Sequence, residues 1–332
     1  MVCEWSDKIF SVTEADFEAL ALKIFRFQYA NNSIYNSFVD ALQIKPEQVN
    51  SVTKIPFLPI SFFKSHKVVS SEFEPEAIFE SSGTTQLVKS KHFVKSVNLY
   101  SQSFLLGFEK FYGPITNYCI LGLLPSYLEQ KNSSLVFMVN ELIQKSKHSQ
   151  SGFYLNEFDL LAKTLIQLEE AMQKTLLIGV TFALLDFAKE YSIPLKHTIV
   201  METGGMKGRQ EEITRQEVHH RLKKSFQSET IHSEYGMTEL LSQAYSQGNG
   251  IFKTPPWIQL FLREKEDPLT IQKRELGKPR TGAINSIDLA NVYSCSFIAT
   301  DDLGKIYDDD SFEILGRLDE SDVRGCSQLV IY

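Results

Sequence analysis

Residues 80–92 form a polar segment whose side chains are suited to holding phosphate. The segment carries several hydroxyl groups, a single glycine, Gly83, and lysines behind it. Backbone N–H groups near such a glycine can surround an anion, because glycine adopts conformations that a residue with a Cβ resists. The residues expected to contact phosphate are Ser81, Ser82, Gly83, Thr84 and Thr85, followed by either Lys89 or Lys91.

This segment is not the common P-loop, which needs two glycines and an adjacent Lys-Ser or Lys-Thr pair. A polar turn between two strands is an alternative interpretation, since Ser, Gly and Thr are frequent in turns. Residues elsewhere in the chain must decide between these interpretations.

Residues 235–239, Tyr-Gly-Met-Thr-Glu, form a second segment with chemical potential. They follow a predicted strand, and ligands of open α/β sheets collect at the carboxyl ends of strands. Tyr235 offers a stacking face, and Gly236 permits close backbone approach. Thr238 offers a hydroxyl to phosphate, and Glu239 offers a carboxylate to a divalent metal. A strand end followed by a capped helix is the alternative, because Thr and Glu also serve as helix caps.

Alternating strand and helix patterns surround both segments. The expected helices cover residues 14–30, 132–147, 157–173 and 211–226, and the expected buried strands cover residues 118–124, 175–180, 198–201 and 230–233. Such alternation predicts a largely parallel α/β sheet. Beyond Gly248 the sequence changes to short strands and turns, with strands expected at residues 283–289, 295–299 and 312–315. We therefore expect an α/β core over residues 1–248 and a β-rich subdomain over residues 249–332.

Composition excludes several classes of function. The chain has 332 residues, is 43% hydrophobic and has a net charge of −7. An acidic chain of this kind is not expected to bind nucleic acid or anionic membrane, because attraction to phosphate needs clustered positive charge. The cysteines and histidines lack metal-binding spacing, so reduced thiols and no zinc site are expected. Since no signal sequence or membrane-spanning run is visible, a cytoplasmic protein is expected.

Tyr-Gly-x-Thr-Glu is a hallmark of the adenylate-forming enzymes, which include acyl-CoA synthetases and firefly-type luciferases. The chain resembles this superfamily at further motifs in the family order. The loop at 81–85 is similar to the family's nucleotide-phosphate loop, and Met-Glu-Thr-Gly-Gly at 201–205 is similar to its adenine-covering turn. Thr-Asp-Asp-Leu-Gly at 300–304 resembles its ribose-binding motif, and Gly-Arg-Leu-Asp at 316–319 resembles its hinge motif.

The resemblance implies the N-terminal domain fold of these enzymes, with layered α/β sheets and a smaller β-rich subdomain, and it implies ATP and Mg²⁺. The roles that it implies are adenine stacking for Tyr235, α-phosphate contact for Thr238, Mg²⁺ binding for Glu239, adenine covering for Gly204 and Gly205, ribose binding for Asp302 and a place near the ribose for Arg317. Taken alone, the acidic pair at 301–302 is also explained by a solvated surface turn.

Departures from the usual pattern narrow the resemblance. Gln86 stands where most members have glycine, which leaves the choice between Lys89 and Lys91 open. The chain ends at Tyr332, close behind Arg317, so the usual C-terminal domain is expected to be lacking. This plan resembles the acyl-protein synthetase (LuxE-like) branch, which shares the segment at 56–64 and the Phe-Glu-Ser-Ser-Gly-Thr-Thr form of the loop.

In that branch a cysteine near the C-terminus accepts the acyl group, and Cys326 occupies such a place. Arg324 beside it could favour the reactive thiolate. The alternative is that Cys326 is a buried residue of a final strand, since free cysteine is often buried.

The expected activity is ATP-dependent conversion of a fatty acid, presumed long-chain, to acyl-AMP, followed by acyl transfer to a cysteine thiol. The catalytic residues expected are Cys326, Thr238, Glu239 and Lys89, and the expected partner is a protein acyl acceptor or a reductase. Two alternatives stay open: a ligase that uses coenzyme A or another acceptor, and a non-catalytic nucleotide-binding module. His92 is noted only for its closeness to the loop.

Overall fold

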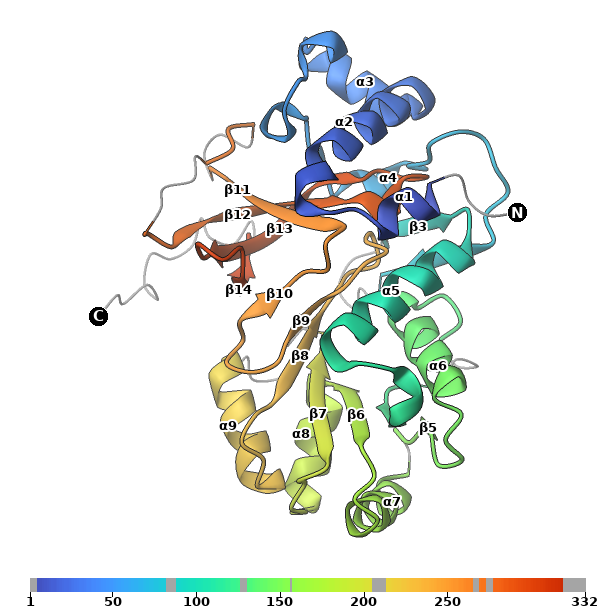
Figure 1. The fold of residues 1–332 in the computed structure, drawn as a ribbon, viewed down its shortest axis with the longest axis vertical. Helices are drawn as coiled ribbons and strands as arrows, with labels where there is room; N and C mark the ends of the chain where they lie inside the picture. The colour runs from blue at the N-terminus through green and yellow to red at the C-terminus, as the bar shows by residue number, and fades with distance from the viewer. Residues whose placement is uncertain are drawn as a thin grey trace.

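One hydrogen-bonded sheet runs through the described part of the chain (Figure 1). The structure is a computed structural model, and it describes residues 5–81, 88–125, 130–155, 157–204, 213–264, 269–272 and 277–318. Within these ranges the sheet has 12 strands, and its main path follows the order β11-β12-β13-β14-β10-β9-β8-β7-β6-β4-β5.

The β4 to β8 end of the sheet is parallel. Its strands are β4 (Cys119–Leu123), β5 (Gly152–Phe153), β6 (Thr175–Val180), β7 (Thr198–Thr203) and β8 (His232–Tyr235). Every residue of β4 is buried, as expected for a parallel strand that is covered on both faces.

Helices cover the two faces of this parallel half. One face packs against α5 (Val97–Tyr112) and α6 (Ser134–Ser146) through alternate strand residues such as Ile120 and Ile178. The other face packs against α7 (Phe158–Glu170), α8 (Thr181–Glu190) and α9 (Arg215–Phe226) through residues such as Leu121 and Leu177. Successive side chains along each strand point to opposite faces of the sheet and therefore pack into two separate apolar cores.

The other half of the sheet is mainly antiparallel. It contains β9 (Ala244–Ser246), β10 (Phe252–Lys253), β11 (Ile258–Arg263), β12 (Arg280–Asp288), β13 (Phe297–Ile306) and β14 (Phe312–Arg317), with short β1 (Leu58–Pro59) parallel to β13. Because β10 pairs with both β9 and β14, the antiparallel strands continue the parallel sheet.

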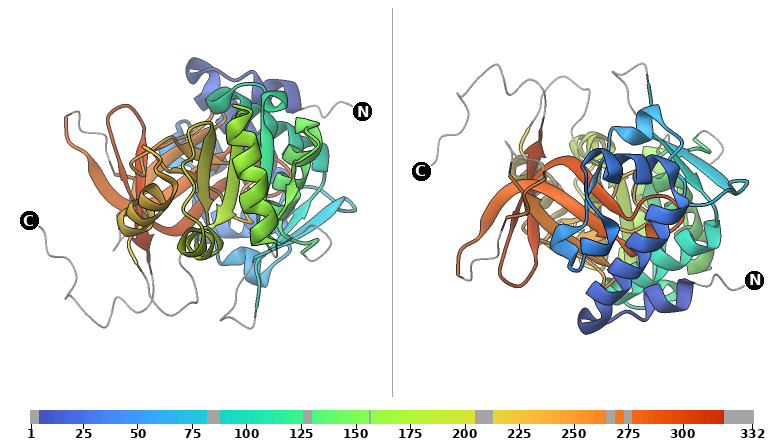
Figure 2. Two further views of the ribbon diagram at one scale, coloured as in Figure 1. Left: turned by 90° about the horizontal axis from the view of Figure 1, so that it is seen from below. Right: turned by 90° about the horizontal axis from the view of Figure 1, so that it is seen from above.

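N-terminal helices cover the β11 to β13 region (Figure 2). They are α1 (Ser6–Phe10), α2 (Glu14–Asn31) and α3 (Ser33–Ala41), followed by short α4 (Phe62–Ser65) and by the 3₁₀ turns η1 (Pro46–Gln48) and η2 (Val52–Lys54). The further turns η3 (Ile115–Asn117) and η4 (Leu289–Asn291) precede β4 and β13. Gln28 of α2 donates to the carbonyl oxygens of Asn291 and Val292, both at 3.0 Å. This contact ties α2 to the loop before β13.

The hairpin β2 (Ala77–Glu80) and β3 (Lys91–Val94) forms a separate two-stranded sheet. Its connection contains residues 82–87, which lie outside the described ranges. The polar segment at 80–92 therefore does connect two strands, a position that suits a turn and a ligand loop alike.

The predicted α/β fold is confirmed, and each predicted strand and helix has a counterpart, although β13 ends at Ile306, well beyond the predicted end at residue 299. The helices α5 and α8 and the β2–β3 hairpin were not among the predicted elements. The alternative interpretation of residues 301–302 as a solvated surface turn is not borne out, because β13 runs through both residues. The alternative of a capped helix after β8 is not borne out either, because residues 236–241 contain no helix and have a turn at Thr238 and Glu239. The division at residue 248 stays a prediction.

No helix in the described ranges is long and apolar enough to cross a bilayer. Cys119 and Cys295 are free and buried, and Cys3 and Cys326 lie outside the described residues.

Candidate functional site

Three residues that the sequence singled out meet where β8, β13 and β14 come together. The hydroxyl of Tyr235 donates to Asp302 Oδ2 at 2.7 Å, and Arg317 Nε lies 3.3 Å from Asp302 Oδ1. Asp302 and Arg317 are paired across the β13–β14 ladder. The strand register therefore presents one carboxylate to both a phenol and a guanidinium.

The ring of Tyr235 is fixed by its neighbours. It makes edge contacts with Phe252 and Phe312, with centroids 6.0 and 5.8 Å away. Burial, reinforced by the Asp302 carboxylate, raises the pKa of Tyr235 well above its usual value. Tyr235 therefore keeps its proton near neutral pH and donates to Asp302, whose carboxylate it helps to orient. Ribose binding by Asp302 stays a prediction. The stacking role of Tyr235 stays a prediction.

The backbone of Thr238 and Glu239 is held from behind by polar side chains. His92 Nδ1 lies 2.9 Å from the carbonyl oxygen of Thr238, and Asn291 Nδ2 donates to that of Glu239 at 2.7 Å. Glu239 is 6% exposed. The turn that carries both predicted side chains is therefore a fixed element.

Asp288 supports the residues that follow this turn. Its carboxylate accepts from the N–H of Leu241 at 3.0 Å, from the hydroxyl of Ser242 at 2.7 Å and from the N–H of Ala290 at 3.0 Å. Burial raises the pKa of Asp288 to about 6, although these hydrogen bonds oppose the rise. Buried polar groups in folded proteins normally have hydrogen-bond partners, and the Asp288 carboxylate has three here.

The donor set at Glu239 is compatible with Mg²⁺. The described residues contain no cluster of three or more metal-ligating side chains. Mg²⁺ is commonly bound by one or two carboxylates together with substrate phosphates and water. The single carboxylate of Glu239 would therefore be a sufficient protein contribution if substrate phosphates and water supplied the other ligands.

The β2–β3 hairpin, which carries the predicted phosphate-binding segment, is described only on either side of residues 82–87. Ser81 Oγ accepts from the N–H of Ser90 at 3.0 Å, and Ser81 N–H donates to the Ser90 carbonyl at 3.1 Å. Lys89 and Lys91 both lie near Glu80, at 3.6 and 3.7 Å, with side chains about half exposed. Exposed pairs of this kind contribute little, so either lysine can leave Glu80 for a phosphate at small cost. The choice between them stays open.

The predicted adenine turn is described as far as Gly204. Its φ is +74°, a left-handed conformation that favours glycine. Its carbonyl accepts from Thr181 Oγ1 at 3.0 Å. The remaining predicted site residues, Ser82, Gly83, Thr84, Thr85, Gly205 and Cys326, lie outside the described residues.

Comparison with models of protein families shows to which family the chain belongs. The profile of the LuxE acyl-protein synthetase family matches residues 4–331. The chain belongs to the LuxE family. The predicted resemblance to the acyl-protein synthetase branch is thereby confirmed. A search of curated protein sequences gave no match.

Solved structures of adenylate-forming enzymes share the fold of this LuxE-family chain. ATP-bound MatB from Rhodopseudomonas palustris has a TM-score of 0.54 and 16% identity, with 74% of this chain and 49% of MatB covered. A 2-hydroxyisobutyryl-CoA ligase in its postadenylation state has a TM-score of 0.62 and 9% identity, with 94% of this chain and 70% of the ligase covered. The predicted fold is thus confirmed, and the chain spans about half the length of MatB.

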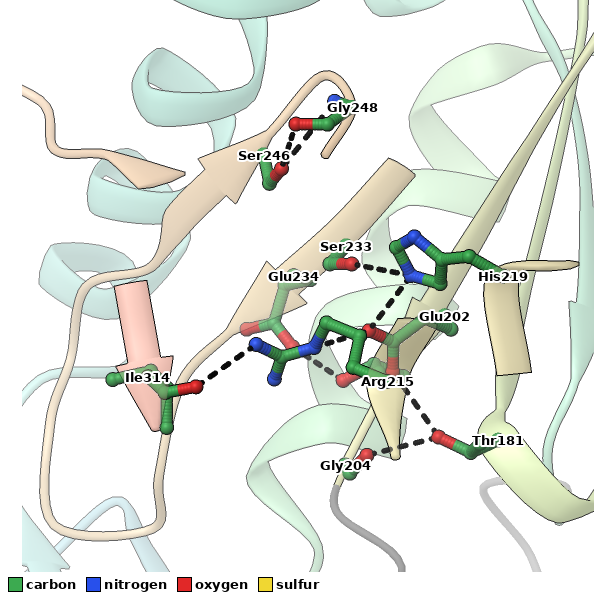
Figure 3. A network of polar contacts seen from close by, with 11 residues as sticks. Thr181, Glu202, Gly204, Arg215, His219, Ser233, Glu234, Ser246, Gly248 and Ile314 are labelled. Atoms are coloured by element: carbon green, nitrogen blue, oxygen red, sulfur yellow. Dashed lines mark hydrogen bonds and ion pairs between the residues drawn. The ribbon is translucent and has the colours of Figure 1, made fainter. Parts of the chain in front are cut away.

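Next to the predicted adenine turn of this LuxE-family chain lies a buried polar network that the sequence analysis missed (Figure 3). Glu202 Oε1 lies 3.3 Å from Arg215 Nε and 3.6 Å from His219 Nε2, and Thr181 Oγ1 donates to Glu202 Oε2 at 3.1 Å. Burial opposes ionisation of Glu202, but His219 and Arg215 together lower its pKa below the usual value. Arg215 also reaches the carbonyl of Ile314 on β14 at 3.4 Å. The sequence signal that could have revealed this network was Glu202, an acidic residue inside an otherwise mainly apolar strand.

Glu234 is the second buried carboxyl group of this region, on the strand that ends in Tyr235. It is 8% exposed and accepts a hydrogen bond from Thr203. A Cβ placed on Gly236 would lie 2.5 Å from Glu234 Oε1. The Glu234 carboxyl group therefore leaves no room for a side chain at position 236. This is a second reason for glycine there, in addition to the close ligand approach expected from the sequence.

Replacing Glu234 with Gln is expected to change how stability depends on pH. Burial raises the pKa of Glu234 from 4.5 to about 7. Between these values the unfolded chain loses the proton while the folded chain keeps it. The free energy of unfolding of the parent should therefore fall by about 3 kcal/mol over this range and by no more above it. Gln cannot ionise, so E234Q should lack that fall.

Urea unfolding of parent and E234Q at about pH 5 and about pH 8 measures this difference. The exposed Glu229 provides a matched control, since E229Q removes a solvated carboxylate from the turn before the same strand. Parallel pH curves for parent and E234Q would contradict the assignment.

Proposed function

We propose that this LuxE-family chain activates a carboxylic acid with ATP and passes the acyl group to a thiol. The observation that carries the proposal is the convergence of Tyr235, Asp302 and Arg317 beside the fixed Thr238–Glu239 turn. A donor, a carboxylate and a cation fit the ribose and adenine side of a nucleotide. The neighbouring hydroxyl and carboxylate fit its phosphates.

Adenylation would begin when the substrate carboxylate attacks the α-phosphorus of ATP. The bond from phosphorus to the bridging oxygen breaks, and pyrophosphate leaves with its electron pair. Negative charge grows on the phosphoryl oxygens, where the Thr238 hydroxyl, the hairpin and Lys89 or Lys91 can donate to it. Bound Mg²⁺ would supply further charge stabilisation at these oxygens, with Glu239 as its protein ligand.

Acyl transfer would follow because AMP is a far better leaving group than oxide. A thiolate attacks the carbonyl carbon of acyl-AMP, a thioester forms, and AMP leaves. Cys326 is the proposed thiol, by analogy of its position with the family's acyl-accepting cysteine. Arg324 beside it would favour the thiolate. A fatty acid is the proposed substrate, and a protein acceptor or a reductase is the proposed partner.

Purified protein with ATP, Mg²⁺ and a panel of fatty acids of increasing length is expected to release pyrophosphate in an acid-dependent manner. Mass spectrometry should then find a hydroxylamine-labile acyl adduct on the peptide that contains Cys326. C326S should keep pyrophosphate release in the first turnover and lose the adduct, whereas C3S should keep both.

Other outcomes point to other functions. Full multiple turnover by C326S with coenzyme A would indicate a ligase with a different acceptor. ATP binding without pyrophosphate release, with every acid in the panel, would indicate a nucleotide-binding module and overturn the proposal.

A further inference from the structure

His92 uses both of its ring nitrogens in buried contacts. It lies on β3, is 1% exposed, and packs edge-on against Phe63 with ring centroids 5.7 Å apart. Nδ1 lies 2.9 Å from the carbonyl oxygen of Thr238, and Nε2 lies 2.8 Å from Ser294 Oγ. The ring therefore bridges elements that are far apart in the sequence.

The chemistry of these partners fixes the state of the ring. A carbonyl oxygen can only accept, so Nδ1 must carry a proton. Burial lowers the pKa of His92 to about 4, so the imidazole is neutral near pH 7 and Nε2 is an acceptor. The Ser294 hydroxyl must then donate to Nε2. The ring is thus held in one tautomer and one orientation, which an apolar or differently shaped side chain cannot reproduce.

The elements that His92 joins are those that carry the proposed phosphate and metal ligands. β3 begins at Lys91 and is one arm of the hairpin that also carries Ser81 and Lys89. Thr238 directly precedes Glu239. The hairpin is a sheet of its own, so no ladder hydrogen bond to the main sheet fixes its position within the described residues.

Ser294 extends the connection to the other support of the same turn. Its N–H donates to the carbonyl of Asn291 at 2.9 Å, and Asn291 Nδ2 donates to the carbonyl of Glu239. His92 on β3 and Asn291 on the loop that carries Ser294 thus hold successive carbonyl groups of the turn, and the His92–Ser294 contact connects the two supports.

We propose that His92 is a positioning residue for adenylate formation, because its Nδ1–H bond to Thr238 sets the phosphate hairpin and the Thr238–Glu239 turn at one fixed separation. This inference rests on the proposed function. A triphosphate must meet donors of the hairpin and the Glu239 carboxylate at the same time. A shift of about 1 Å between such groups can lower a rate about 100-fold.

Substitutions that separate the two ring contacts test the proposal. In H92N the side-chain amide stands near the Nδ1 position and keeps a donor for the Thr238 carbonyl. In H92Q the amide reaches the Nε2 position and loses that donor. S294A is the matched control on the other side of the ring, since it removes the Nε2 partner and leaves the Thr238 contact.

The measurement is kcat and KM for acid-dependent pyrophosphate release, with melting temperature as the record of folding. H92Q is expected to lower kcat about 10- to 100-fold, with KM for the acid little changed. H92N and S294A are expected to stay within a few-fold of the parent. Losses of kcat that merely follow melting temperature across all three variants would overturn the positioning role, as would a folded H92Q with parental kcat.

Pyrophosphate release by the parent protein distinguishes failure of the proposed function from failure of the inference about His92. Absence of pyrophosphate release by the parent overturns the proposed function itself, and the role of His92 falls with it. Release by the parent together with an unaffected H92Q overturns only the inference about His92.

Discussion

D302A is expected to raise the KM for ATP about 100-fold or more in pyrophosphate release. Asp302 accepts from Tyr235 at 2.7 Å and faces Arg317 at 3.3 Å, and the proposed function adds the ribose hydroxyls as further partners. Hydrogen bonds to a charged group contribute about 1.5–3 kcal/mol each. Losing two of them to the ribose would cost about 3–6 kcal/mol of binding, which is at least about 100-fold.

The neighbouring Asp301 provides the control for charge. It is partly buried on the same strand, and D301N removes the same unit of charge without touching the Tyr235 contact. D301N should leave the KM for ATP within a few-fold of the parent. Equal effects of D301N and D302A would mean that only the general field of the two acids matters, and Asp302 would lose its assigned place at the ribose.

Strand and helix patterns predicted the fold because burial follows local periodicity. Ile120 and Leu121 point to the apolar cores on opposite faces of β4, and the continuous apolar run typical of a strand buried on both faces is visible in the sequence. The β2–β3 hairpin, which carries the polar segment at 80–92, was not predicted. Its strands are short, and the burial pattern of β2 holds only one fully buried position, Phe79, so the two-residue signal is weak.

The site was predictable where a motif carries its own chemistry. Tyr235 and Asp302 were identified separately, but their hydrogen bond depends on β13 and β14 joining the parallel sheet through β10, which no local pattern reveals. His92, Glu202 and Glu234 are residues whose contacts could not be predicted from a motif. Their roles arise from partners far away in the sequence or on neighbouring strands, so residue type and spacing, which mark Glu202 only as an acid inside an apolar strand, did not reveal these contacts.

The polar residues around the turn make one connected support. Asp288 and Asn291 hold the backbone from Glu239 to Ser242, and Gln28 of α2 holds the loop that contains Asn291. Removing one partner from such a buried set leaves the other unsatisfied, which costs about 1–3 kcal/mol. Helix α2 therefore helps to support this turn although it supplies no predicted ligand.

E239Q is expected to give the largest loss of rate, about 100-fold or more in kcat for pyrophosphate release. Gln keeps the size of the side chain and the contact between Asn291 and the backbone carbonyl, so the turn should keep its shape. What it removes is the negative charge proposed to hold Mg²⁺, and metal stabilisation of developing phosphoryl charge is worth several kcal/mol. The Mg²⁺ concentration needed for half-maximal rate should rise in the same variant.

Titration of the rate with Mg²⁺ distinguishes loss of a metal ligand from general damage. A structural defect would lower the rate at every Mg²⁺ concentration and lower the melting temperature with it. Loss of the ligand should instead move the titration while the melting temperature without nucleotide stays near that of the parent. E229Q, which removes an exposed carboxylate near the same strand, should leave the titration unchanged. An unmoved midpoint in E239Q would remove Glu239 from the metal site, because a carboxylate that binds the ion cannot be neutralised without weakening it.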